Sequence, residues 1–319
     1  MQNFFFLKAD RPMWPASANV FVIKDCEGLI LIDVGCGLKK FIRKLYQQFK
    51  INSLDIKDIH SIVISHAHPD HMGGISWIFK DLKRFNIEFS DIKIYINKIE
   101  KRIAQNINLL NLYFDVPLIS KYYNSDSEHN LKKISDINDN FKILCAMSQL
   151  PEDCNIQTFD DDDILNFGDY KFKILTTPGH APGHTSFFEL DRHFLLSGDL
   201  IGEKGTAWYS PSSGGAIGYL DSLKKIEKLS VSSVYPAHGN KFYNIKERIT
   251  QIRNKILLKD QKIMEKLEKS PQKLINLVKL FYNDSLAQIF PGVAIIESHL
   301  IKLEKEGKIL RNGEKVYKI

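Results

Sequence analysis

Short apolar runs alternate with amphipathic stretches along the N-terminal part of the chain. Residues 19–24 and 29–33 form two such runs, and the turn-forming sequence between them predicts a β-hairpin with a buried second strand. Apolar residues at helical spacing predict a helix over 38–49. The apolar run 59–65 predicts another strand, and 75–85 predicts another helix. The N-terminal part is therefore expected to consist of strands with helices between them.

Several predicted strands lead into loops that carry histidine or aspartate. These loops contain glycine or proline and comprise residues 66–71, 177–185, 197–199 and 236–239. Binding and catalytic groups tend to lie on loops that a rigid scaffold holds in place. The sequence therefore predicts that these polar side chains converge at the ends of the strands.

The loop 66–71 holds the densest group of candidate metal ligands in the chain. It contains His66, His68, Asp70 and His71, and it follows an apolar strand. Imidazole nitrogens and carboxylates suit Zn²⁺ or iron. Only ten histidines occur in the chain, so three in six residues favour a metal site over a polar surface loop.

Residues 98–157 interrupt the pattern of strands. Leucine and aromatic residues near 109–114 indicate a helix, and an Asn-, Asp- and Ser-rich stretch follows over 124–140. We interpret 98–157 as an insertion-like helical region, a helical pair with a loose connection over the site.

From residue 244 onward the pattern becomes helical. An apolar stripe predicts a helix over 245–269, Ser270-Pro271 is typical of a second helix start, and a third helix is expected at about 292–306. Asn312-Gly313 then predicts a β-hairpin. Three helices and a hairpin are typical of a winged helix, which we expect over 244–319, after a catalytic domain over 1–243.

The third of these helices would be the recognition helix of a DNA-binding protein. It carries Glu297, Glu304 and Glu306 as well as Lys302 and Lys305, so it is far from uniformly basic. We therefore favour a packing or substrate-lid module over a reader of specific duplex DNA.

The distribution of charge along the chain bears on the kind of binding partner that we expect. Residues 241–319 carry 17 Lys and Arg against 9 Asp and Glu, a net charge of +8, which leaves −2 for residues 1–240 of a chain with net charge +6. This surplus can indicate a polyanionic partner or a lysine-rich solvated surface.

The four cysteines show no Cys-x-x-Cys spacing, which argues against a thiolate zinc site. Without a recognisable leader or membrane span, we expect a cytoplasmic protein and no membrane partner.

Five motifs, in order along the chain, resemble those of the metallo-β-lactamase superfamily. They are Asp33-Val34-Gly35, His66-x-His68-x-Asp70-His71, Pro178-Gly179-His180, Gly198-Asp199 and Pro236-Ala237-His238-Gly239. The resemblance implies an α/β (α+β) fold, the four-layer αββα sandwich of that superfamily, followed here by the small winged-helix-like domain.

The resemblance also implies a site for two metal ions. Three histidines would hold the first ion, three residues the second, and one aspartate would bridge them: His66, His68 and His180; Asp70, His71 and His238; and Asp199. Asp70 is also the expected catalytic residue. Asp33 and His184 would support the site without binding metal. Two zinc ions are expected, with iron or a mixed pair possible, and they would share a water whose pKa falls towards neutrality.

The chain further resembles the β-lactamase-like protein 2 family, whose members combine this core with a winged-helix-like tail and act on single-stranded RNA. Residues 202–206, 219–223 and 299–307 carry that resemblance, which covers nearly the whole chain except about 98–157. It implies a phosphodiesterase or endoribonuclease acting on single-stranded RNA.

Three other functions stay open. The core motifs are shared with glyoxalase II-like thioesterases and lactonases, which hydrolyse small-molecule esters or thioesters. A mononuclear iron persulfide dioxygenase would keep the same ligands but bind one iron ion, in only one of the two metal positions. A nucleic-acid-binding regulator with the core as a sensor is the non-enzymatic alternative.

Overall fold

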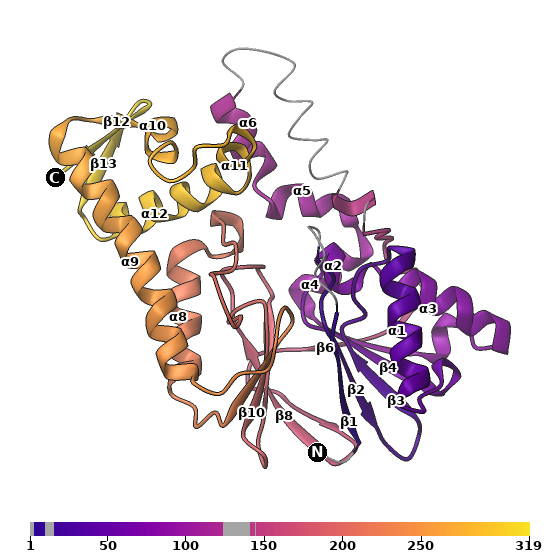
Figure 1. Cartoon of the computed structure of the whole chain (residues 1–319). Helices are drawn as coiled ribbons and strands as arrows, with labels where there is room; N and C mark the ends of the chain where they lie inside the picture. The colour runs from indigo at the N-terminus through magenta and orange to yellow at the C-terminus, as the bar shows by residue number, and fades with distance from the viewer. Residues whose placement is uncertain (1–2, 10–15, 124–140, 144) are drawn as a thin grey trace.

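Two mixed β-sheets face each other, and helices cover both outer sides (Figure 1). The computed structural model describes residues 3–9, 16–123, 141–143 and 145–319. In the first sheet, β1 to β3 are antiparallel and β3 to β6 are parallel. Its strands follow chain order: β1 Phe4–Leu7, β2 Val20–Lys24, β3 Leu29–Ile32, β4 Ile59–Ile64, β5 Lys93–Asn97 and β6 Asn155–Phe159.

The second sheet has the order β11-β10-β9-β8-β7. Its only parallel pair is β10 with β11 among the strands that the structure describes. The bounds are β7 Ile164–Phe167, β8 Tyr170–Thr176, β9 Thr185–Glu189, β10 Phe194–Gly198 and β11 Ser233–Pro236.

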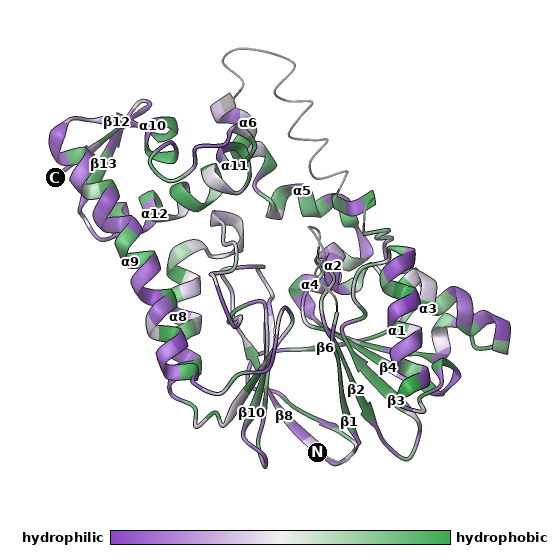
Figure 2. Ribbon diagram, in the orientation of Figure 1, coloured by the Kyte–Doolittle hydropathy of each residue, from purple (hydrophilic) through white to green (hydrophobic). Residues whose placement is uncertain are grey.

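Alternating side chains divide the core into layers. In β2, Val20 and Val22 join the cluster under the outer helices of the first sheet, whereas Phe21 and Ile23 join the cluster between the two sheets. This is the period-two alternation of a strand buried on both faces. Figure 2 shows the corresponding hydrophobic colour along β3 and β4.

Helices complete the four-layer sandwich. The outer layer of the first sheet contains α1 Lys39–Ile51 and α3 Ile75–Leu82, and that of the second contains α8 Gly215–Glu227 and α9 Ile245–Lys269. In α1, Phe41, Ile42, Leu45 and Phe49 are buried, the four residues that the sequence places on one face. The predicted αββα fold is confirmed.

The region 98–157 contains short helices and the start of a strand. The helices are α4 Lys98–Gln105, α5 Leu110–Tyr113 and α6 Val116–Tyr123. Residues 124–140, the expected loose connection, lie outside the described residues. The boundary at 157 is wrong, because Asn155–Gln157 belong to β6 and pair with β5. No apolar run marks β6, since its residues before Phe159 are exposed or half-buried.

The C-terminal segment contains the expected first and third helices and the hairpin, but it differs between them. The helix predicted over 245–269 is α9, and the hairpin is formed by β13 Ile309–Asn312 and β14 Lys315–Lys318. After Ser270-Pro271 the chain forms the short strand β12 Gln272–Lys273 beside β14 before α10 Leu274–Val278 begins, so the helix start predicted there is wrong. The segment α11 Ser285–Ala287, the turn Gln288–Gly292 and α12 Val293–Lys305 complete it.

Helix α9 belongs to two hydrophobic clusters. Ile249, Ile252 and Ile256 pack with α8 against the second sheet, whereas Ile263 and Leu267 pack with α10, α12 and the hairpin. Ile119 of α6 also packs in this second cluster. One continuous helix and one segment from the middle of the chain therefore tie the C-terminal unit, residues 270–319, to the core.

Helix α12 is a buried helix of this assembly. It packs against α8 and α10, and its polar residues Glu297, His299 and Lys302 are buried. Ser285–Lys305 is long and apolar enough to cross a membrane, but 67% of its most apolar window is buried within the protein. Glu297, His299 and Lys302 of this helix therefore face the interior, whereas Glu304 and Lys305 at its C-terminal end are exposed.

Candidate metal centre

The candidate ligands meet where strands of both sheets end. His66, His68, Asp70 and His71 follow β4, in a loop that runs into the short helix α2 Pro69–Met72. His180 lies in the loop after β8, Asp199 directly after β10 and His238 after β11. The structure thus brings together all seven residues that the sequence predicts as ligands.

These side chains form two groups. The first contains His66, His68 and His180, and the second contains Asp70, His71, Asp199 and His238. Within each group the candidate ligand atoms lie within 4.8 Å of one another. The division matches the two sets that the resemblance implies, with Asp199 counted in the second.

Asp199 faces both groups. Its Oδ2 lies 3.3 Å from Nε2 of His180, and its Oδ1 lies 3.4 Å from Nε2 of both His71 and His238. One carboxylate therefore offers one oxygen to each group, which is the arrangement a bridging ligand requires. Asp70 Oδ2 completes the second group at 3.2 Å from Nε2 of His238.

The polar atoms at the centre fit a metal. Nε2 of His66, His71 and His180 is buried in each case and makes no hydrogen bond within the described part of the chain. A buried polar atom without a partner is costly and rare in folded proteins. Neutral imidazole and carboxylate are the ligand types of zinc and iron sites, so the donor set suits either metal.

The two groups differ in protonation. Burial and the neighbouring histidines hold the pKa of His66 and His68 well below the usual value, so these rings are neutral. Burial also opposes charge on His238, but Asp199 and Asp70 outweigh it and raise the pKa of His238 to about 9. Metal binding at the second group therefore has to displace a proton, whereas the first group is ready to bind.

Asp33 supports the site from behind His71. Its Oδ2 accepts hydrogen bonds from Nδ1 of His71 at 2.9 Å and from the hydroxyl of Ser65 at 2.8 Å, while Oδ1 accepts the Ser65 N–H at 2.8 Å. Carboxylates in this position fix the orientation and tautomer of a ligating histidine. The sequence does not single out Ser65, because a lone serine before a motif carries no signal.

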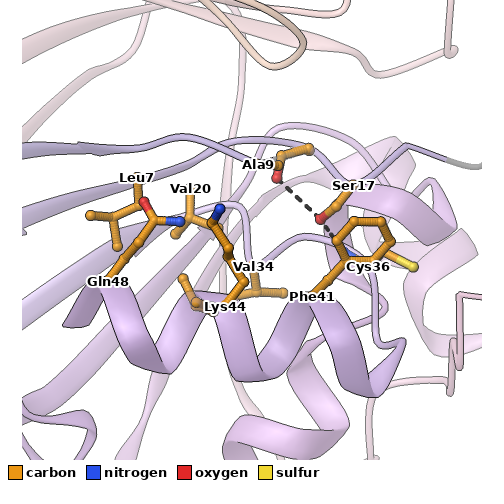
Figure 3. A pocket seen from close by; sticks show the side chains of 11 residues that line it. Leu7, Ala9, Ser17, Val20, Val34, Cys36, Phe41, Lys44 and Gln48 are labelled. Carbon is orange, nitrogen blue, oxygen red and sulfur yellow. Dashed lines mark hydrogen bonds between the residues drawn. The ribbon is translucent and has the colours of Figure 1, made fainter. Parts of the chain in front are cut away.

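The backbone that follows Asp33 packs closely against Ser17. Gly35 has φ +72°, and a Cβ there would lie 2.5 Å from the hydroxyl oxygen of Ser17. The same oxygen accepts the N–H of Cys36 at 2.9 Å, beside a small cavity next to α1 (Figure 3). Only glycine allows this close approach, which holds the Asp33 loop in place.

His184 cannot bind metal in this arrangement. Its Nε2 accepts the backbone N–H of Asp199 at 2.9 Å, and its Nδ1 lies 2.8 Å from the hydroxyl of Thr177. Both ring nitrogens are thus engaged. In His180, by contrast, Nδ1 donates to the carbonyl of Trp208 at 2.8 Å, which leaves Nε2 facing Asp199. This geometry agrees with the choice of His180 as ligand and His184 as support.

The other histidines lie outside the centre. His60 pairs with Asp25 at 3.1 Å, His193 is exposed, and His129 lies outside the described residues. His299 is buried between Asp260 and Tyr209.

An aromatic wall borders the metal groups. A pocket of about 750 Å³, partly open to solvent, is lined by His68, Asp70, His180, Asp199 and His238 on one side. Ala16 and four aromatic residues line the rest: Phe114, Phe141, Trp208 and Phe290. The ring of Phe290 lies 5.3 Å from that of Trp208 and 6.2 Å from that of Phe114.

Three parts of the chain build this wall. Trp208 comes from the core, Phe114 and Phe141 come from the region 98–157, and Phe290 comes from the C-terminal unit. Among the described residues that line the pocket, none is Lys or Arg. The sequence did not identify these aromatic residues, because nothing in their local pattern distinguishes them from core residues.

Comparisons with known proteins agree with the fold. The family described as the metallo-beta-lactamase superfamily matches residues 13–83 and 115–238. A beta-lactamase-like protein 2 homologue of Drosophila melanogaster is 26% identical over 299 residues, covering 91% of this chain and 83% of the relative. The human acyl-coenzyme A thioesterase MBLAC2 is 23% identical over 233 residues, covering 70% of this chain and 74% of the relative.

A solved structure extends the likeness to the whole chain. The crystal structure of a metallo-beta-lactamase family protein from Thermus thermophilus has a TM-score of 0.77 at 19% identity. The alignment covers 100% of this chain and 99% of that one, so the shared fold includes the C-terminal unit.

Proposed function

Since this chain belongs to the metallo-beta-lactamase superfamily and is a metal-dependent hydrolase, we propose that it hydrolyses an ester or thioester with an apolar acyl group. The aromatic wall beside the metal groups is the observation that carries this proposal. Apolar surface removed from water contributes about 25 cal/mol per Å², so the wall favours an acyl chain. The name of the human relative, an acyl-coenzyme A thioesterase, supports the same substrate class.

The residues of the chain have separate tasks in this proposal. The first histidine group and the Asp70 group would each hold one ion, and Asp199 would contribute one oxygen to each. Two bound ions supply an activated water at neutral pH and polarise a carbonyl oxygen. Asp33 and His184 keep His71 and Asp199 in place, and the aromatic wall orients the acyl group and excludes water from it.

RNA cleavage has weaker support. A phosphodiester backbone is bound mainly by Lys and Arg, and the described residues lining the pocket include neither. The excess of Lys and Arg in residues 241–319 therefore does not extend to the described residues that line this pocket. Single-stranded RNA remains the alternative outcome of the experiment that follows.

The test combines a substrate panel with metal removal. We expect the purified chain to hydrolyse acyl thioesters, to lose that activity on treatment with a chelator, and to regain it with Zn²⁺. Labelled single-stranded RNA should stay intact under the same conditions. Cleavage of RNA together with inert thioesters would contradict the proposal. Metal analysis and oxygen uptake with a persulfide separate a dinuclear hydrolase from a mononuclear iron dioxygenase.

The aromatic wall can be tested by replacing Phe290→Ala. Loss of one large apolar contact, about 1.5–3 kcal/mol, should raise KM for a long-chain thioester about 10- to 100-fold and leave acetyl thioester hydrolysis nearly unchanged. Phe281→Ala is the matched control, because Phe281 is also half-buried in the C-terminal unit but does not line the pocket. An equal effect on short and long substrates, or an equal effect of the control, would show that Phe290 does not contact the acyl chain.

A further inference from the structure

Glu100 connects the two loops that carry the first metal group. It lies in the first turn of α4 and is fully buried. Its Oε2 accepts the N–H of Ala67 at 2.8 Å, and its Oε1 accepts the N–H of Gly183 at 2.7 Å. Ala67 stands between His66 and His68, and Gly183 lies in the loop that presents His180.

The sequence alone suggests another role for this residue. Asn97 caps α4 by accepting the N–H of Ile99 at 2.9 Å, and a glutamate three residues after a cap usually turns back towards it. Here both carboxylate oxygens of Glu100 are instead used by the two ligand loops. Asn97 therefore caps α4 without help from Glu100, whose carboxylate binds the two ligand loops.

The surroundings of Glu100 are built for close approach. A Cβ on Gly183 would lie 2.9 Å from Cγ of Glu100 and 2.7 Å from Oδ1 of Asn97, so the loop reaches the carboxylate only because this residue is glycine. Within the described part of the chain, no Lys or Arg forms an ion pair with Glu100. Burying a carboxylate without a cationic partner is costly, and the two N–H groups offset only part of that cost, because burial still raises the pKa of Glu100 to about 7.

We propose that Glu100 is a positioning residue that fixes the spacing of the two ligand loops and thereby sets the metal affinity of the group formed by His66, His68 and His180. Hydrogen bonds from backbone N–H groups are directional, and those from Ala67 and Gly183 end on the two oxygens of one side chain. One rigid side chain that accepts from both loops holds Nε2 of His66 and His180 on the same ion position. The inference rests on the proposed metal-dependent function.

The test measures metal affinity without any substrate. Glu100→Gln and Glu100→Ala are titrated with Zn²⁺ against a chromophoric chelator, and the Co²⁺ absorption spectrum reports the ligand geometry. Loss of a residue that orients metal ligands typically lowers affinity about 10- to 100-fold. We expect a loss in this range for Glu100→Ala and a smaller one for Glu100→Gln, whose amide oxygen still accepts one N–H.

Glu189→Gln is the matched control. Glu189 is as buried as Glu100 and also accepts two backbone N–H groups, from Lys171 and Arg192, but it pairs with the Arg192 side chain at 3.1 Å and lies at the end of β9 away from the ligand loops. Unfolding of the metal-free forms checks that all variants fold. Wild-type Zn²⁺ affinity in both Glu100 variants, or an equal loss in the control, would overturn the inference while the hydrolase proposal stands. A wild-type chain that binds no metal would overturn both.

Discussion

Asp199→Ala is expected to reduce hydrolysis by at least about 10²-fold in kcat/KM, because loss of a residue that only orients metal ligands already costs about 10- to 100-fold and Asp199 would itself bind the ions. The reason is the double use of its carboxylate, with Oδ2 towards His180 and Oδ1 towards His71 and His238. Removing it takes an oxygen from both groups, so each group loses one of the ligands that would hold its ion. Steady-state kinetics with a thioester substrate and metal analysis of the purified variant measure the effect.

Asp191→Ala provides the comparison for this substitution. Asp191 is exposed in the turn between β9 and β10, at the end of β10 opposite Asp199, so its loss should leave both activity and metal content unchanged. Asp199→Ala with wild-type activity would mean that hydrolysis takes place elsewhere in the chain. Normal metal content with lost activity would instead limit Asp199 to the reaction step.

Asp260→Ala is expected to destabilise the protein by about 3–5 kcal/mol, the cost of breaking a buried charge pair from one side. Asp260 of α9 accepts hydrogen bonds from Nδ1 of His299 at 2.6 Å and from Nζ of Lys302 at 2.7 Å. His299 in turn lies 2.8 Å from the hydroxyl of Tyr209, next to the wall residue Trp208. Without the carboxylate, buried His299 loses its partner at Nδ1, and buried Lys302 keeps only Glu306 as an ion-pair partner. Urea unfolding at neutral pH measures the loss.

The pH dependence of this effect has a defined sign. Burial raises the pKa of Asp260, but His299 and Lys302 outweigh burial and hold it below the usual value. A carboxyl with a lowered folded-state pKa contributes stability above its unfolded pKa of about 3.9 and loses that contribution as the pH falls through the folded value. The difference between wild type and variant should therefore shrink in acid. Asp221→Ala, which breaks an exposed pair with Lys224, should cost only about 0–1 kcal/mol.

Much of the catalytic core could be predicted from the sequence because its signals are local. Strand alternation at 20–23 and the helical stripe of α1 each follow from a short repeat in hydrophobicity. The ligand motifs are local too, since each is a strand followed by a loop with histidine or aspartate. Where such local signals were present, the structure places the elements within a few residues of the prediction.

Other features depend on contacts that no local pattern encodes. The strand β6 is held by pairing with β5 although its residues before Phe159 are exposed or half-buried, and Phe290 contacts Phe114, which lies 176 positions earlier in the chain (290 minus 114). The partners of the polar residues in α12 could not be predicted either, because His299 and Lys302 bind Asp260 on another helix. Buried polar groups are satisfied by partners that only the fold brings near.

The aromatic wall and the metal ligands come from different segments, which has an evolutionary consequence. The ligands lie on loops of the two sheets, whereas Phe114 and Phe290 lie on segments between and after them. Trp208 contributes to both the metal site and the pocket, but through different atoms. Its backbone carbonyl orients His180, and its indole lines the pocket. Under the proposed function, mutation can therefore alter the choice of acyl group while selection preserves the hydrolytic chemistry, so one ancestral reaction can diversify over many substrates.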